Sequence, residues 1–218
     1  MRLLILGASG GCGRWTTRLA HEAGHSVTAL VRPGTAFVAP AVVVVRRGTV
    51  LDDADLAPAV AGQDAVISCL GAQRANPHNP WSPLRPPLHI AEDSAGRLVQ
   101  AMNVAGVRRL AAISAAGVGD SLSATNAMMR WLLRHSTIGD MYADLAAMEA
   151  VYRASALDWL TVRPVTLVDA KAPSLAATVV PRFRMVSTIS RADVAAWLLR
   201  AATDPRPITD RTPMIGYR

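Results

Sequence analysis

The sequence predicts a single α/β domain in which helices cover both faces of a doubly wound, mainly parallel sheet. Two observations predict this fold class. Short apolar runs alternate with segments of helical spacing along nearly the whole chain, which is the order that parallel strands joined by crossover helices produce. The first apolar run, residues 3–6, contains no polar residue, as suits a strand buried on both faces, and a glycine-rich turn follows it directly.

The glycines of this turn are spaced Gly7-x-x-Gly10-x-x-Gly13, which differs from the common G-x-G-x-x-G dinucleotide fingerprint. No Gly-Lys-Ser/Thr follows, so the turn is not a P-loop. A residue without Cβ lets backbone N–H groups approach a phosphate at the start of the next helix, where the helix dipole also favours an anion. The position of the glycine-rich turn between a buried strand and a helix favours nucleotide binding over a purely structural turn.

The remaining elements follow from periodicity, turn residues and capping signals. Asp52 or Asp53 is expected to cap one helix, and Ser190 is expected to cap the last long helix. Further strands are expected at residues 25–31, 41–45 (buried), 63–71 with its exit turn, 109–114, 158–164 and 212–216, with a short extended stretch at 177–180. Helices are expected at residues 14–20, up to residue 60, at 88–105, 128–133 and 141–154, and after residue 190.

Arg32 stands at the end of the second predicted strand, where dinucleotide-binding folds meet the adenosine ribose. An acidic residue here prefers a free 2′-hydroxyl, and an arginine accommodates a 2′-phosphate. No acid lies at this point, so NADP(H) is favoured over NAD(H), with a solvated turn arginine as the alternative. Because ligands bind at the carboxyl ends of parallel strands, Gly7, Arg32 and Cys69 to Gly71 should converge on one crevice.

Two segments interrupt the regular alternation and are expected on the substrate side of this single domain of residues 1–218. Residues 72–87 are rich in proline and asparagine and are too long for a simple connector, which suggests a substrate loop or lid. A poorly ordered surface insertion is the alternative. Residues 165–190 form the second segment, in a small C-terminal portion.

Charge and cysteine content narrow the expected partners. The net charge is +7, but the arginines are scattered rather than collected in a basic run, which argues against nucleic acid. No apolar run reaches the roughly 18 residues of a membrane span, and the first residues form a strand rather than a signal peptide, so a cytoplasmic location is expected. Cys12 and Cys69 form neither a disulfide framework nor a metal set, and small buried side chains are expected. The expected partner is a small-molecule substrate, with no nucleic acid and no membrane, and the chain is expected to be a monomer or a homodimer.

Four motifs in order carry a family resemblance. They are Gly7-Ala8-Ser9-Gly10-Gly11-Cys12-Gly13, Ala29-Leu30-Val31-Arg32, Leu157-Asp158-Trp159-Leu160-Thr161-Val162-Arg163-Pro164 and Ile189-Ser190-Arg191-Ala192-Asp193-Val194-Ala195. With them the chain resembles the atypical short-chain dehydrogenases/reductases of the Rossmann fold. Within that class it is most similar to the NAD(P)H-binding group that includes flavin reductase/biliverdin reductase B and the NmrA-like proteins.

The resemblance implies the cofactor contacts. The pyrophosphate would be cradled by the turn residues Gly7, Ser9, Gly10 and Gly13, with Gly11 and Cys12 between them. Arg32 would meet the 2′-phosphate, Val50 the edge of the adenine, and Cys69, Leu70 and Gly71 the adenosine side. The backbone after Pro164, at Val165 and Thr166, would meet the nicotinamide carboxamide.

The catalytic pair of most short-chain dehydrogenases, Tyr-x-x-x-Lys, is missing. Four residues beyond Tyr142 and Tyr152 stand Ala146 and Ala156, and the sole lysine is Lys171. In that pair the tyrosine protonates the substrate oxygen as hydride arrives and the lysine lowers the pKa of the tyrosine.

Three residues stand as catalytic candidates in place of the missing pair. The assisting serine position is Ala115, with Ser114 one place earlier, and the histidine of the biliverdin reductase group is replaced by Leu145. Tyr142 is the candidate acid and Ser114 the candidate orienting group; Asp144, on the same helix, is the third candidate.

The resemblance therefore implies an NADPH-dependent reductase of a small planar or carbonyl-type acceptor such as a flavin or quinone. Such acceptors need little acid–base help, because much of the rate comes from holding hydride donor and acceptor face to face. Two alternatives stay open. One is a non-catalytic NADP(H)-sensing regulatory protein of the NmrA-like type, and the other is a redox-neutral biosynthetic enzyme on the same scaffold.

Overall fold

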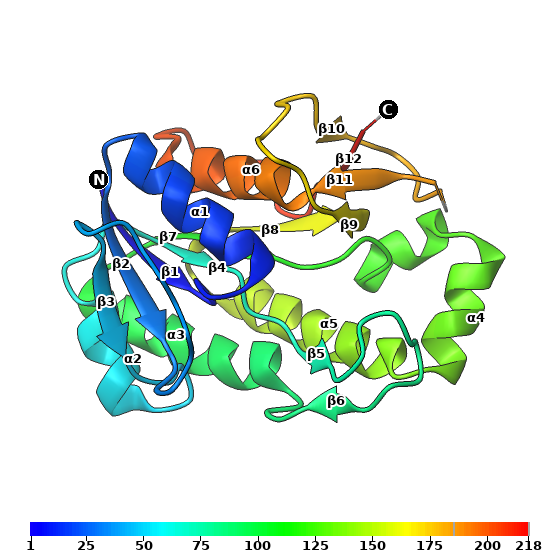
Figure 1. Ribbon diagram of the computed structural model, residues 1–218, viewed down its shortest axis with the longest axis horizontal. Helices are drawn as coiled ribbons and strands as arrows, with labels where there is room; N and C mark the ends of the chain where they lie inside the picture. The colour runs from blue at the N-terminus through cyan, green and yellow to red at the C-terminus, as the bar shows by residue number, and fades with distance from the viewer. Residues whose placement is uncertain (185, 218) are drawn as a thin grey trace.

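The computed structural model describes residues 1–184 and 186–217, and an eight-stranded sheet forms its centre (Figure 1). Position 185, within the predicted 165–190 segment, and position 218 lie outside the described residues. The strands in spatial order are β10 (Thr178–Val179), β12 (Met214–Gly216), β8 (Asp158–Pro164), β7 (Arg109–Ile113), β4 (Ala65–Ser68), β1 (Arg2–Leu6), β2 (Ser26–Val31) and β3 (Val44–Arg47). All neighbours pair in parallel except β10 with β12. The predicted doubly wound α/β fold is confirmed.

Helices cover both faces of the sheet (Figure 1). One face carries α1 (Gly11–Glu22) and α6 (Arg191–Thr203), which pack against each other. The opposite face carries α2 (Asp53–Val60), α3 (Ile90–Ala105) and α5 (Ile138–Ala154). A further helix, α4 (Ala127–His135), packs against α5 beyond the sheet, after the short 3₁₀ helix η1 (Gly119–Ala124).

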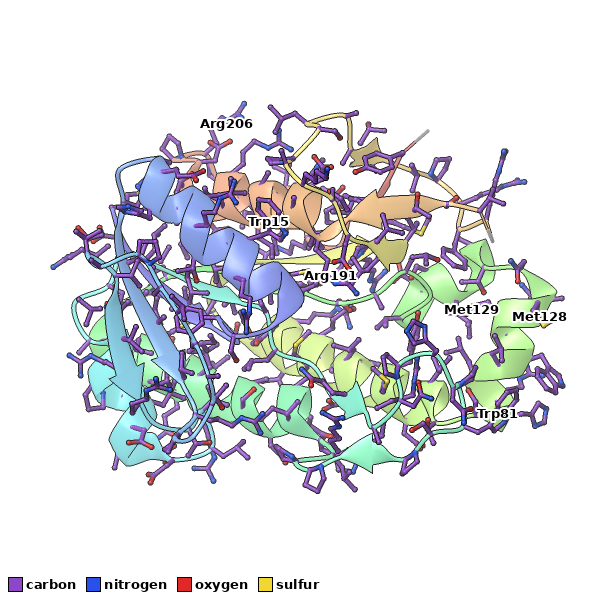
Figure 2. All side chains as sticks on the ribbon, viewed as in Figure 1. Trp15, Trp81, Met128, Met129, Arg191 and Arg206 are labelled. Carbon is purple, nitrogen blue, oxygen red and sulfur yellow. The ribbon has the colours of Figure 1, made fainter. Side chains whose placement is uncertain are left out.

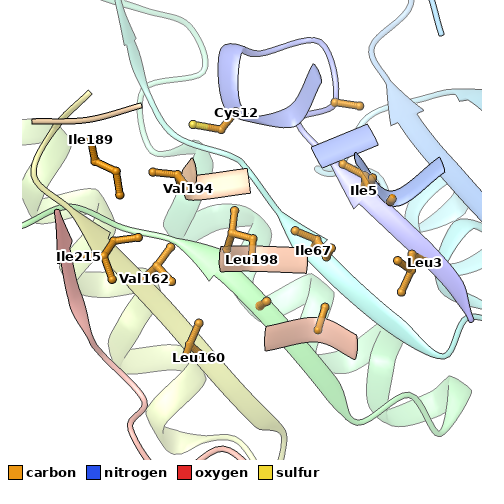
Figure 3. Packing of buried hydrophobic residues seen from close by; sticks show 14 of the residues in the cluster. Leu3, Ile5, Cys12, Ile67, Leu160, Val162, Ile189, Val194, Leu198 and Ile215 are labelled. Carbon is orange, nitrogen blue, oxygen red and sulfur yellow. The ribbon is translucent and has the colours of Figure 1, made fainter. Parts of the chain in front are cut away.

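Strand β1 explains the unbroken apolar run at the start of the sequence. Leu3 and Ile5 pack into the core beneath α1 and α6 (Figure 3), whereas Leu4 and Leu6 pack into the core beneath the other helices. Because successive side chains of a strand point to opposite faces, a strand with helices on both sides needs apolar residues at every position.

The expected helix caps are present. The Asp52 carboxylate accepts a hydrogen bond from the Ala54 N–H at 2.9 Å, and the Ser190 hydroxyl accepts one from the Asp193 N–H at 3.0 Å. Each cap satisfies an N–H group that has no partner inside its helix.

Strand β3 departs from the prediction. It spans Val44–Arg47 rather than 41–45, because its pairing with β2 sets Val44 opposite Thr28 and Arg47 opposite Val31. It is also the outermost strand, so all four of its residues are exposed or half-buried rather than buried.

Short elements also lie within the two segments assigned to the substrate side. The 72–87 segment holds a hairpin of β5 (Gln73–Arg74) and β6 (Leu84–Arg85), and the 165–190 segment holds β9 (Thr166–Val168), which pairs with β11 (Thr188–Ser190). Among residues 1–184 and 186–217, none of the helices has both the length and the apolar character needed to cross a membrane.

Candidate cofactor and substrate site

A cavity of about 180 Å³ opens at the carboxyl ends of β1, β2 and β4. Eight of the predicted cofactor residues line it together, namely Gly7, Ser9, Gly10, Arg32, Val50, Cys69, Leu70 and Gly71. The hairpin segment closes one side with Gln73, Arg85 and Pro86. The expected convergence of these positions on one crevice therefore holds.

The glycine turn is built so tightly that side chains cannot enter it. Gly7 has φ +71°, and a Cβ there would lie 2.6 Å from the Cys69 carbonyl oxygen. A Cβ on Gly13 would lie 2.1 Å from the carbonyl oxygen of Gly7. Both contacts are with backbone, which cannot move aside without breaking the strand or the helix, so these two positions require glycine.

The first turn of α1 is open to an anion. Gly10 is its N-cap, no side chain caps it within the described residues, and no acidic residue lies in its first turn. Free N–H groups and the positive end of the helix dipole therefore face the crevice, which suits a diphosphate. The residues present fit the pyrophosphate of a nicotinamide dinucleotide.

The end of the cavity that is predicted to hold the adenosine is basic. Arg32 is exposed at its rim, and Arg47, from the neighbouring strand β3, donates a hydrogen bond to the Thr35 carbonyl at 2.8 Å. Arg47 thus orders the turn that carries Arg32. Sequence reasoning missed this role, although the Arg46-Arg47 pair after a predicted strand was the available signal.

The two cysteines contribute no charge to the site. Cys12 points into the core beneath α6 (Figure 3), and burial raises its pKa to about 11 although the charge of Arg191 acts to lower it. Burial likewise raises the pKa of Cys69 to about 12. Both thiols therefore stay protonated at neutral pH. Cys12 can meet a ligand through its backbone but not through its side chain.

A second cavity, of about 220 Å³, lies beyond the ends of β7 and β8. Ser114, Tyr142, Pro164 and Val165 line it, with apolar side chains of Met129, Leu167 and Phe183. The Ser114 hydroxyl is buried and has no hydrogen-bond partner among the described residues. The structure therefore brings two catalytic candidates together with the predicted nicotinamide-side positions.

Tyr142 reaches this cavity from α5. Its hydroxyl donates to the Ala116 carbonyl at 3.1 Å, and burial raises its pKa to about 12, with a smaller opposing effect from Arg74. In the described part of the chain no lysine contacts it. Tyr142 is thus a hydrogen-bond donor that is hard to ionise.

The expectation that Asp144 is a catalytic candidate needs a correction. The third catalytic candidate is buried, and its carboxylate accepts hydrogen bonds from the N–H groups of Ala91 at 3.1 Å and Glu92 at 2.8 Å. These are first-turn donors of α3, so Asp144 caps that helix from the neighbouring α5. Two residues along α5 from Tyr142, it points toward α3 instead of the crevice.

A buried ion pair lies next to the residues that are predicted to meet the nicotinamide. Arg163 donates to Glu149 through Nη2 at 2.6 Å and through Nε at 3.0 Å, and its Nη1 meets Asp120 at 2.6 Å. The side chains of Arg163 and Glu149 are each 2% exposed. The pair joins the end of β8, immediately before Pro164, to α5.

The predicted 72–87 loop is anchored rather than loose. The Trp81 indole donates to the His135 carbonyl at 2.7 Å, and the Thr137 hydroxyl lies 2.8 Å from the carbonyls of Pro80 and Ser82. Trp81 lies beside α4 at one end of the molecule (Figure 2). The segment is therefore tied to the α4–α5 junction, and its role toward a substrate stays a prediction.

Comparison with known families shows to which family the chain belongs. A family model described as NAD(P)H-binding matches residues 7–205. The chain belongs to this NAD(P)H-binding family. The predicted NAD(P)-binding class is thereby confirmed, and the cofactor of this chain is a nicotinamide dinucleotide.

Relatives of the NAD(P)H-binding chain include a probable pinoresinol-lariciresinol reductase 3 of Arabidopsis thaliana, 38% identical over 74 residues. That match spans 32% of this chain and 24% of the relative, about a quarter of its length.

Solved structures share the fold over nearly the whole chain. The anaerobillin reductase ChuY of Escherichia coli O157:H7 has a TM-score of 0.77 at 21% identity, over 99% of this chain and 96% of that one. A short-chain dehydrogenase/reductase of Veillonella parvula, in complex with NADP, has a TM-score of 0.76 at 18% identity, over 99% and 94%. The oxidoreductase ylbE of Lactococcus lactis has a TM-score of 0.79 at 17% identity, over 100% and 91%.

Proposed function

We propose that this protein is an NADPH-dependent reductase of a small planar acceptor such as a flavin or a quinone. The observation that carries the proposal is the cavity beside Pro164 and Val165, because its lining is mainly apolar and the side chains of Ser114 and Tyr142 stand at its wall. Reductases among the similar proteins, ChuY among them, support the reaction class.

The high pKa of Tyr142 bears on the type of acceptor. A carbonyl group needs a proton on its oxygen as hydride arrives, and a tyrosine with a pKa of about 12 and no lysine partner is a poor acid. Flavins and quinones accept hydride with less help, since the developing charge is delocalised over the ring. The residues therefore favour a delocalised acceptor over an isolated ketone or aldehyde.

Each group has a defined task in this mechanism. The dinucleotide, when bound, supplies the hydride. The first turn of α1 holds its pyrophosphate, and the backbone after Pro164 orients the nicotinamide. The free hydroxyl of Ser114 can donate to an acceptor oxygen or nitrogen, and Phe183 and Leu167 exclude water from the reacting faces. Residues 72–87 and 165–190 form the substrate side of the single domain.

The direct test is a turnover assay with purified protein. NADPH is mixed with a flavin, a quinone, an aldehyde or a ketone, and the absorbance of the reduced nicotinamide is followed. Oxidation with flavin or quinone is expected. No oxidation with any acceptor, together with tight binding of both NADPH and NADP⁺, would contradict the proposal and favour a sensing protein.

Replacement of Tyr142 with phenylalanine separates acid catalysis from positioning. Turnover of a carbonyl acceptor is expected to be slow in wild type, and what remains of it would depend on Tyr142 as the proton donor, so its kcat should fall further by about 100-fold; the kcat for a flavin should change about twofold or less. Because the pKa of Tyr142 lies near 12, its ionisation should not alter the wild-type rate between about pH 6 and pH 9. Initial rates across that pH range, for both acceptors, are the measurement; an equal loss with both would argue against the delocalised acceptor.

Arg32→Gln tests the preference for NADP(H). If Arg32 binds the 2′-phosphate, the variant should bind NADPH about tenfold more weakly while its affinity for NADH stays unchanged. Arg18→Gln is the matched control, since Arg18 lies on the outer face of α1 and pairs with Glu22. Dissociation constants by calorimetry provide the comparison. Equal losses with both cofactors would show that Arg32 does not select the 2′-phosphate.

A further inference from the structure

The side chain of Arg191 lies across the first turn of α1. Arg191 is the first residue of α6, and α6 packs against α1 on the same face of the sheet. A Cβ on Gly11 would lie 2.5 Å from the Arg191 Cδ and 2.8 Å from its Nε. Figure 2 shows Arg191 beside the N-terminal end of α1. The absence of a side chain at Gly11 thus leaves room for a guanidinium from another helix.

The partner of this guanidinium is weakly held. Arg191 Nη1 lies 2.8 Å from the Asp169 carboxylate, whose side chain is 87% exposed, while the Arg191 side chain is 31% exposed. An exposed pair of this kind contributes little to stability and is screened by salt. An anion with more charge, placed at the same helix end, can therefore displace Asp169.

We infer that Arg191 is a pyrophosphate-binding residue, and that Asp169 competes with the cofactor for it. This inference rests on the proposed binding of the dinucleotide at the first turn of α1. A diphosphate there would meet the free N–H groups of α1 from one side and the guanidinium from the other. Arginine presents its N–H donors as a planar fork, which matches two oxygens of a phosphate.

Two substitutions are expected to change the affinity for NADPH differently, and this difference makes the inference specific. Arg191→Gln removes the cation, so its affinity for NADPH should fall about tenfold. Asp169→Asn removes the competitor and keeps the shape, so its affinity should stay equal or rise. A purely structural role of the pair would make both variants respond alike, because each breaks the same ion pair.

Two small probes locate the effect on the ligand. ADP carries the diphosphate but no 2′-phosphate, and 2′-AMP carries the 2′-phosphate but no diphosphate. Arg191→Gln should weaken the binding of ADP and leave that of 2′-AMP unchanged, and Arg32→Gln should do the reverse. Arg18→Gln, which alters the net charge equally but two turns farther along α1, should change neither.

The experiment is calorimetric titration of wild type and these variants with NADPH, ADP and 2′-AMP at two salt concentrations. If Arg191→Gln binds ADP as tightly as wild type, the inference is wrong although dinucleotide binding stands. If wild type binds neither NADPH nor ADP, the proposed cofactor site itself fails. Circular dichroism and thermal melting check that each variant is folded, and a folded Asp169→Asn with weakened NADPH binding would also overturn the inference.

Discussion

Replacing Gly13 with alanine is expected to lower the affinity for NADPH about 100-fold or more and to destabilise the fold by about 1–3 kcal/mol. The added methyl group would overlap the Gly7 carbonyl oxygen at 2.1 Å and the Ala8 Cα at 2.8 Å. Either α1 moves away from β1 or the turn opens, and both displace the N–H groups that hold the diphosphate. Calorimetry and thermal melting measure the two effects.

Gly96 is the matched control for this substitution. It lies in the middle of α3 on an exposed face, and a Cβ there would meet no atom within 4 Å. Gly96→Ala should therefore stabilise the protein by about 0.5–1 kcal/mol, because alanine loses less backbone entropy in a helix, and it should not affect NADPH binding. A Gly13→Ala variant that behaved like Gly96→Ala would refute the tight-turn explanation.

Replacing Glu149 with alanine is expected to have the largest effect on stability, a loss of about 3–5 kcal/mol. The substitution leaves Arg163 buried with only Asp120, whose side chain is 81% exposed. A buried charge without its main partner is costly because the lost hydration is no longer compensated. Denaturant unfolding measures the change in the free energy of unfolding.

Two further variants show whether the loss comes from the unpaired charge. The double variant Glu149→Leu with Arg163→Met fills the same space with apolar atoms, so it should be markedly more stable than Glu149→Ala. The exposed pair of Arg18 with Glu22 offers the surface comparison, and Glu22→Ala should cost about 0–1 kcal/mol. Equal losses for Glu149→Ala and Glu22→Ala would contradict a dominant role for burial.

The pairing with Arg163 also links stability to pH. Its hydrogen bond holds the pKa of Asp120 below the ordinary value, and since Asp120 is mostly exposed the contribution is small. A depressed folded-state pKa contributes stability that is present above the unfolded-state pKa and is lost as the pH falls through the folded-state value.

Much of the fold could be predicted because its signals are local. The apolar run of β1, the glycine spacing and the caps at Asp52 and Ser190 each depend on neighbours within a few residues. The bounds of β3 could not be predicted in the same way, because pairing with β2 sets its register and its place at the sheet edge exposes it.

The residues of the site also differ in whether local sequence could predict them. Seven of the eight predicted cofactor residues that line the crevice follow β1, β2 or β4, so the order of the sequence predicted that they lie together. Asp144 could not be judged from sequence, since its direction depends on how α5 packs against α3. Arg163 with Glu149 joins the consecutive elements β8 and α5, and Arg191 with Gly11 joins elements far apart in the chain; each contact depends on how the elements pack, which no local pattern predicts.

The protonation state of the two thiols bears on how oxidants can act on this protein. Oxidants and electrophiles attack thiolates, and Cys12 and Cys69, the chain's two cysteines, stay in the unreactive neutral form. Neither thiol is therefore expected to react readily with peroxide or glutathione at neutral pH, so oxidation of cysteine is not expected to control the binding of a ligand in the crevice.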